Sequence, residues 1–213
     1  MNGTLSVAAP PIPAASAAVT TPILCNGGTA TVTITAVNGV APYTYTFNGV
    51  TQVGNGVYPG IPAGTGYAWS VYDANGCGPV TGLIDVTEPD TISATATVTS
   101  PVICIGATGT VTIVANGGTV PYTFTFNGVT QVGNGVFTGI YAGNGYVWSV
   151  DDVNGCGPVT GTLDITEPPI PAATAAVTGD ILCAGGTATV TLTASSGTAP
   201  YTYLWSNGST NQQ

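Results

Sequence analysis

An internal repeat of 79 residues constrains the fold of this 213-residue chain more than any other feature of its sequence. Residues 11–89 and 90–168 align without gaps and agree at about 51 positions, and residues 169–213 match the first half of the same unit. Residues 1–10 match the end of a unit, so we expect them to be the closing strand of a preceding or partner repeat. The sequence therefore predicts two complete domains followed by an incomplete third.

The hydrophobic pattern within a unit is that of short β-strands. In residues 29–37, Val32 and Ile34 alternate with threonines, and this period of two places the apolar side chains on one face. Asn48 and Gly49 predict a tight hairpin turn, because both residues accept a positive φ. Roughly seven such strands fit in a unit, and no segment has a helical period. We therefore expect an all-β fold of tandem immunoglobulin-like β-sandwiches.

The chain contains no Lys, Arg or His, so its nine acidic residues give a net charge of −9. Without cations it has no phosphate clamp, which argues against nucleic-acid partners. The imidazole and amine groups that serve as general bases, covalent nucleophiles and metal ligands are also missing. No long apolar run is present, so we expect no membrane insertion. The composition therefore favours an ordered β-protein that is not an enzyme and holds no cofactor.

Five cysteines recur with the period of the repeat. Cys25 and Cys77 occupy the same positions in the first unit as Cys104 and Cys156 in the second, and Cys183 repeats the first of each pair. We expect one disulfide in each complete repeat, Cys25–Cys77 and Cys104–Cys156, with the partner of Cys183 outside this segment. Each bond would close a loop of about 53 residues and stabilise its domain by roughly 4 kcal/mol.

A zinc site is the competing interpretation of these cysteines. Zinc ligands are clustered in the sequence as CxxC or Cys/His pairs, and the five cysteines lack that spacing. Disulfides are thus the favoured interpretation, and they imply an oxidising, extracellular compartment at the cell surface or beyond it.

Several motifs that recur in a fixed order resemble the SprB-type repeat. They are APYTYLWSNGST (199–210), DANGC (73–77), DVNGC (152–156) and the closing DVTEP and DITEP (85–89 and 164–168). SprB-type repeats occur in tandem in very large cell-surface adhesins of gliding Bacteroidetes. The resemblance covers both full units and the half unit. It implies surface display with adhesion or filament building, and it implies no catalytic residue.

The carboxylates that recur in a constant position are Asp85 and Glu88, repeated as Asp164 and Glu167. Residues three apart along a strand point to opposite faces, so these pairs are poorly placed for general acid and base catalysis. We therefore interpret them as solvated strand ends and expect no catalytic residue.

The strongest candidates for a ligand site are Asp73 and Asn75, with their copies Asp152 and Asn154. Their oxygens suit Ca²⁺, but calcium takes about six to eight oxygen ligands and these motifs offer few. The favoured alternative is a tight turn in which Asp and Asn bond to their own backbone and Gly takes a positive φ. Calcium therefore stays only as an alternative to the turn.

The aromatic residues Tyr43, Tyr45 and Trp69 have two interpretations. They would suit a carbohydrate-binding face, but they share the period of two with the aliphatic residues, which favours core packing.

Three residues are candidate glycosylation sites. Asn2 and Asn207 lie in N-x-S/T sequons, and Thr91 lies in a motif resembling the O-glycosylation motif of Bacteroidetes.

Two functions fit these observations. The first is an extracellular structural protein that forms a surface stalk, fibre or filament from tandem or head-to-tail sandwiches, with copies of itself or further repeats as partners. The alternative is an adhesin module that binds glycan or another surface, with or without calcium. An adhesin predicts an exposed cluster that differs between units, whereas near-identical units are typical of a spacer.

Overall fold

The computed structural model describes residues 11–211. All regular structure in this range is β-strand, numbered β1 to β16 along the chain. This confirms the predicted all-β fold. Within the described range no helix is long and apolar enough to cross a membrane. The predicted closing strand in residues 1–10 lies outside the described residues.

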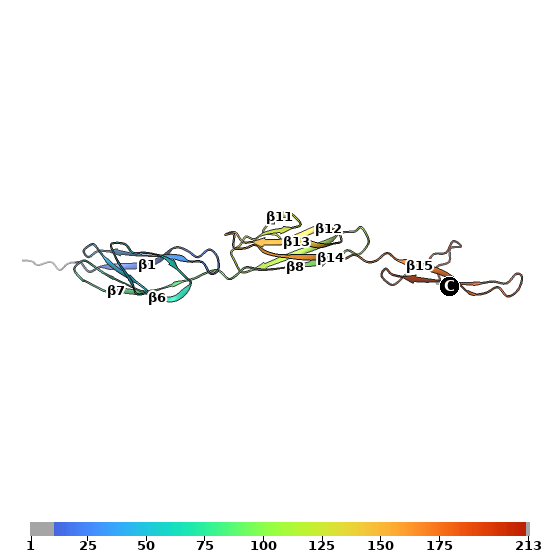
Figure 1. Ribbon diagram of the computed structural model, residues 1–213, viewed down its shortest axis with the longest axis horizontal. Helices are drawn as coiled ribbons and strands as arrows, with labels where there is room; N and C mark the ends of the chain where they lie inside the picture. The colour runs from blue at the N-terminus through green and yellow to red at the C-terminus, as the bar shows by residue number, and fades with distance from the viewer. Residues whose placement is uncertain (1–10, 212–213) are drawn as a thin grey trace, which may run out of the picture. The chain divides into compact units, whose positions relative to one another are not determined.

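Repeat 1 (residues 11–89) folds into two antiparallel sheets. One has the strand order β1–β2–β5 and the other has the order β4–β3–β6–β7, and together they make the predicted sandwich (Figure 1). The seven strands are β1 (Ala14–Thr21), β2 (Ala30–Val37), β3 (Thr44–Phe47), β4 (Val50–Val53), β5 (Val57–Ile61), β6 (Gly64–Tyr72) and β7 (Val80–Val86).

Repeat 2 (residues 90–168) reproduces this arrangement in the orders β12–β9–β8 and β11–β10–β13–β14. Its strands are β8 (Ser93–Ser100), β9 (Gly109–Asn116), β10 (Thr123–Phe126), β11 (Val129–Val132), β12 (Val136–Ile140), β13 (Gly143–Asp151) and β14 (Val159–Ile165). In repeat 3, the described residues form one antiparallel pair, β15 (Ala172–Gly179) and β16 (Thr189–Ser195), and no side chain of that pair is buried.

Spatial contacts divide the chain into two compact units that cut across repeat 2. The first unit combines repeat 1 with two loop regions of repeat 2, and the second holds the other residues from 94 onward. The loop regions that join the first unit are 115–123 and 150–159.

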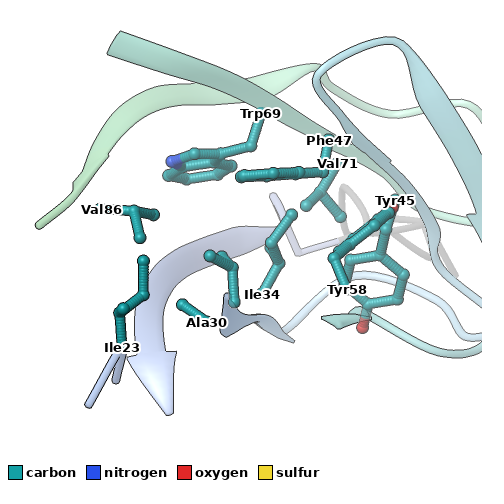
Figure 2. Packing of buried hydrophobic residues seen from close by; sticks show 10 residues of the cluster. Ile23, Ala30, Ile34, Tyr45, Phe47, Tyr58, Trp69, Val71 and Val86 are labelled. Carbon is teal, nitrogen blue, oxygen red and sulfur yellow. The ribbon is translucent and has the colours of Figure 1, made fainter. Parts of the chain in front are cut away.

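The core of repeat 1 lies between its two sheets. Val32 and Ile34 on β2 are 0% and 2% exposed and belong to one buried cluster with Phe47, Trp69 and Val71 of the other sheet. Figure 2 shows Ile34 facing Phe47 and Val71. The remaining buried members are Ile23, Ala30, Tyr45, Tyr58 and Val86. The inward face predicted from the period of two is therefore confirmed, and burying these large side chains is the main apolar stabilisation of the sandwich.

The turns of the structure also match those predicted from the sequence. Asn48 and Gly49 have φ angles of 46° and 82°, and they join β3 to β4 in the predicted hairpin. The hydroxyl of Tyr43 donates a hydrogen bond to the carbonyl of Asn38, and this bond recurs in the other repeats from Tyr122 and Tyr201. Each bond is made across the loop that follows the second strand of its repeat, which is β2, β9 or β16.

Strands of repeat 1 alternate in direction along the chain, and this fixes where each loop lies. β1 runs antiparallel to β2, and β6 runs antiparallel to both β3 and β7. Loops that follow odd-numbered strands therefore lie at one end of the sandwich, beside the end of β7. Loops that follow even-numbered strands lie at the other end, beside the start of β1. We call these ends the tail and the head of the repeat.

Gly82 on β7 is required by the packing of the core. It lies opposite Trp69 on β6, and a Cβ atom at Gly82 would lie 2.5 Å from Cζ2 of the indole. Trp69 is buried with its Nε1 atom unpaired, so the ring has no polar contact that would hold it in a new position.

We predict that Gly82→Ala displaces the Trp69 ring and lowers the free energy of unfolding of repeat 1 by about 1–3 kcal/mol. Denaturant unfolding followed by tryptophan fluorescence measures this. Thr81→Ala, on the exposed face of the same strand, is the matched control and should change stability little. Equal stabilities for the two variants would contradict the packing described for Trp69.

Candidate functional site

The candidate site is a junction made from the tail of one repeat and the head of the next. Its first half is the tail loop (residues 25–28), which follows β1. The N–H of Gly28 donates to the carbonyl of Cys25 at 2.9 Å, and Gly27 has a φ of 76°. Glu88 holds this loop, because its Oε2 atom accepts a hydrogen bond of 2.6 Å from the N–H of Gly27. The loop that presents Cys25 is thus fixed to the end of its own repeat.

The same tail loop recurs in the other repeats. Glu167 accepts a hydrogen bond of 3.2 Å from the N–H of Gly106, beside Cys104. In repeat 3, the N–H of Gly186 donates to the carbonyl of Cys183 at 2.9 Å. Glu88 and Glu167 are exposed just beyond the last strand of each repeat, as the interpretation as solvated strand ends predicts, and each also binds a backbone N–H group of the tail loop. The signal in the sequence was the joint recurrence of the glycine and the glutamate.

The second half of the junction is the head turn (residues 73–77), which follows β6. Asp73 is 3% exposed, and its Oδ1 atom accepts hydrogen bonds from the N–H groups of Asn75 and Cys77 at 3.0 and 2.8 Å. Its Oδ2 atom accepts a third from Val40 at 3.1 Å. This is the turn that the DxNGC motif favours, with Gly76 at a φ of 78°.

Burial and hydrogen bonding act in opposite directions on this carboxylate. Burial alone raises the pKa of Asp73, but the N–H groups of Cys77, Val40 and Asn75 stabilise the charged form. The net pKa of Asp73 lies below its ordinary value. The same balance lowers the pKa of Asp152, through bonds from Cys156, Thr119, Asn154 and Gly155. Both acids remain ionised inside the fold although no cation pairs with them.

A disulfide joins the two halves of the junction. Cys25 of repeat 1 bonds to Cys156 of repeat 2 with a Cα–Cα distance of 5.4 Å, within the usual range for disulfides. The side-chain amide of Asn154 donates to the carbonyl of Leu24 at 3.3 Å, and Sγ of Cys156 lies 3.2 Å from the same oxygen. The bond spans 131 residues, which corresponds to about 5 kcal/mol of stabilisation on the chain-entropy view.

The predicted pairing within repeats, Cys25–Cys77 and Cys104–Cys156, is therefore wrong. Cys77, Cys104 and Cys183 carry free thiols. The physical reason is strand direction: Cys25 follows the first strand and lies at the tail, whereas Cys77 follows the sixth and lies at the head. β1 has eight residues and separates these ends by roughly 25 Å, far beyond the 7 Å that a disulfide can span.

A cavity of about 220 Å³ lies beside the disulfide. Cys25 and Cys156 line it together with the linker between the repeats, residues 89–92, which includes the candidate glycosylation site Thr91. A matching cavity of about 250 Å³ lies beside Cys104 and is lined by Pro168, Pro171 and Gly197. A cavity at the end of the cysteine-bearing tail loop is thus a recurring feature of the described residues.

The other candidate residues lie apart from the junction. Asp85 and Asp164 each accept a hydrogen bond of 2.7 Å from a backbone N–H, donated by Gly66 and Gly145. In repeat 1 this bond lies where the ladder between β6 and β7 shifts register. They are therefore structural, and they do not combine with the glutamates into a catalytic pair. Asn207 is exposed and caps its own turn through Ser209, while Asn2 lies outside the described residues.

The aromatic residues belong to the core. Tyr45 and Trp69 are 7% and 8% exposed, and Tyr43 packs against the same cluster, which supports the core interpretation over an exposed carbohydrate platform. Within residues 11–211, no three acidic, Cys or His residues gather in a way that would hold a metal ion. The oxygens of Asp73 and Asp152 already accept backbone hydrogen bonds. The chemistry that this site presents is thiol–disulfide chemistry.

The chain belongs to the SprB repeat family, which matches residues 17–52, 96–131 and 175–210. These matches recur once in each repeat, as the sequence predicts, and they cover just over half of the chain. The family makes the chain an extracellular repeat protein of the adhesin type, a class that is typically not enzymatic. No curated protein sequence is significantly similar to it.

Three solved structures share a loose likeness of fold. A 282-residue intimin fragment, crystallised with the intimin-binding domain of its translocated receptor, is 17% identical over 79% of this chain and 67% of that chain, with a TM-score of 0.40. The Hoc capsid protein of bacteriophage RB49 is 12% identical over 89% and 70%, with a TM-score of 0.45. The fibronectin(III)-like modules of Clostridium thermocellum CbhA are 12% identical over 71% and 95%, with a TM-score of 0.31.

We predict that Asp73 and Asp152 make the fold sensitive to acid. Because their folded pKa values are lowered, they contribute stability above the ordinary Asp pKa of about 3.9, and this contribution is lost as the pH falls through the folded values. Urea unfolding at a series of pH values should show that stability is level from pH 7 to about pH 5 and then declines.

The double variant Asp73→Asn, Asp152→Asn is expected to be less stable at neutral pH and to show a shallower decline in acid. Asp90→Asn, at an exposed aspartate, is the control and should keep the slope of the unchanged chain. An acid slope that the double variant leaves unchanged would show that these two carboxylates are not its source.

Proposed function

We propose that this chain is a structural, tension-bearing segment of an extracellular stalk, fibre or filament, built from sandwiches that are locked tail to head by disulfides. The observation that carries the proposal is the Cys25–Cys156 bond between successive repeats. A bond inside one repeat would stabilise a domain, whereas a bond between repeats also fixes how far the two can be pulled apart.

The position of the bond defines a short covalent path for tension. Force applied along the chain enters through β1, crosses from Cys25 to Cys156, and leaves through β14 and the linker at Pro168. The residues between the two cysteines, which include both buried tryptophans of the complete repeats, lie outside this path. The cores are therefore shielded from unfolding by tension, as a load-bearing spacer requires.

The composition supports the same role. A chain without Lys, Arg or His contains no salt bridge between side chains, so its stability depends on apolar packing, backbone pairing and disulfides. These contributions depend weakly on ionic strength, unlike exposed ion pairs. An oxidising exterior is the compartment in which such disulfides persist. We therefore place the function outside the cell, where a durable material of this kind is needed.

Single-molecule pulling from the two ends of the chain tests this proposal. We predict that the oxidised chain unfolds without releasing the 131-residue segment between Cys25 and Cys156. Addition of a reductant should release about 450 Å of further extension, at about 3.3–3.6 Å for each residue.

The variant Cys25→Ser is expected to extend fully with or without reductant, and Cys104→Ser should behave like the unchanged chain. An oxidised chain that extends as far as Cys25→Ser at similar force would contradict a tension-bearing role.

A further inference from the structure

The linker between repeats 1 and 2 is bonded to both halves of the junction. On the tail side, the side-chain amide of Asn26 donates a hydrogen bond of 3.2 Å to the carbonyl of Pro89. On the head side, the N–H of Gly118 donates a hydrogen bond of 2.7 Å to the carbonyl of Asp90. Gly118 lies in the loop after β9, which we call the head loop (residues 117–122) because it corresponds to the loop after β2. Neither of these hydrogen bonds involves a cysteine.

The head loop passes so close to the linker that position 117 requires glycine. Gly117 has a φ of 72°, and a Cβ atom there would overlap the carbonyl oxygen of Thr91. Because the obstacle is a backbone atom, any larger residue would have to move the linker away from the head loop. The copies of this position are Asn38 and Ser196, which have φ angles of 59° and 58°. The loop conformation itself thus accepts a side chain, and the approach of the linker excludes one.

Asn26 and Gly117 both differ from their copies in the other repeats. The three tail loops read CNGG (25–28), CIGA (104–107) and CAGG (183–186). The copies of Asn26 are therefore Ile105 and Ala184, whose side chains cannot donate a hydrogen bond. This junction thus combines an amide donor in its tail loop with a glycine in its head loop, and both of them act on the linker.

We propose that Asn26 and Gly117 are the specificity-determining residues of the junction, because they clamp the linker so that Cys25 and Cys156 meet before the disulfide forms. Asn26 and the linker line the same cavity as the two cysteines. The bond then locks an arrangement that hydrogen bonds and steric fit have already selected. A junction with an apolar residue in its tail loop and a side chain at the glycine position brings its cysteines together less well. This inference concerns how the bond is selected, so it goes beyond the load that the bond carries.

The reaction that reports on this selection is thiol–disulfide exchange with glutathione. One protein thiolate attacks oxidised glutathione, releases one glutathione thiolate and leaves a mixed disulfide. The second protein thiolate attacks the protein sulfur of the mixed disulfide and releases the second glutathione, and the released thiolates take up the two protons of the protein thiols. One protein dithiol and one oxidised glutathione become one protein disulfide and two reduced glutathione molecules. The equilibrium constant is the effective concentration of the two cysteines for each other.

The first test equilibrates the purified chain with mixtures of reduced and oxidised glutathione, alkylates the free thiols and measures the fraction of Cys25 bonded to Cys156 by peptide mass spectrometry. Asn26→Ala introduces the residue of repeat 3 and should lower the effective concentration about two- to tenfold, because one hydrogen bond is lost. Gly117→Asn introduces the residue of repeat 1, displaces the linker and should lower it about tenfold or more. Ile105→Ala, in the tail loop of repeat 2, is the matched control and should leave it unchanged.

Amide hydrogen exchange gives a second readout that does not need the bond. In Cys25→Ser, which cannot form the disulfide, the N–H of Gly118 should stay protected because its hydrogen bond to Asp90 belongs to the preformed junction. Adding Gly117→Asn to this variant should remove the protection of Gly118 and leave the amides of β9 protected. The β9 amides therefore show that repeat 2 remains folded.

The inference is overturned if either Asn26→Ala or Gly117→Asn leaves the effective concentration unchanged, or if Ile105→Ala lowers it as far as they do. A Gly118 amide that exchanges freely in Cys25→Ser would also overturn it, because the junction would then exist only through the bond. These experiments measure how the two cysteines meet, whereas the pulling experiment measures the load on their bond. The proposed function and this inference can therefore fail independently.

Discussion

The direction of the strands is the constraint on which the rest of this structure depends. Seven alternating strands place the loop after β1 and the loop after β6 at opposite ends of the sandwich, so the two cysteines of a repeat cannot meet. The bond that forms instead joins the tail of one repeat to the head of the next. The disulfide therefore links two successive repeats instead of cross-linking a single small domain.

The acidic residues help to position the same loops, although the chain has no Lys, Arg or His to pair with them. Asp73 and Glu88, with their copies, bind backbone N–H groups that orient the head turns and tail loops. Hydrogen bonds from N–H groups stabilise a carboxylate without a counter-ion, which is why a chain with no cations can keep buried charges. The carboxylates that looked like solvated strand ends are therefore part of what positions the cysteines.

The sequence alone was sufficient to predict the strands and turns but not the partners of the disulfide. The alternation around Val32 and Ile34, and the Asn48–Gly49 turn, are local patterns, and the structure matches them. The cysteine spacing is also regular, but a 79-residue period fits pairing within a repeat and pairing between repeats equally well. Strand direction distinguishes these two pairings. Cys25 follows the first strand of its repeat and Cys77 follows the sixth, so they lie at opposite ends of the sandwich. The contact between Glu88 and Gly27 is also long-range, at 61 residues, and the joint recurrence of the two residues is its only sign in the sequence.

The central claim is that the disulfide joins successive repeats, and a peptide map of the unreduced protein tests it most directly. Trypsin has no site in a chain without Lys or Arg, so the digestion uses chymotrypsin or pepsin, followed by mass spectrometry. The account predicts a linked pair of peptides that contain Cys25 and Cys156, with Cys77 recovered outside that pair. A linked pair that contains Cys25 and Cys77 would contradict it.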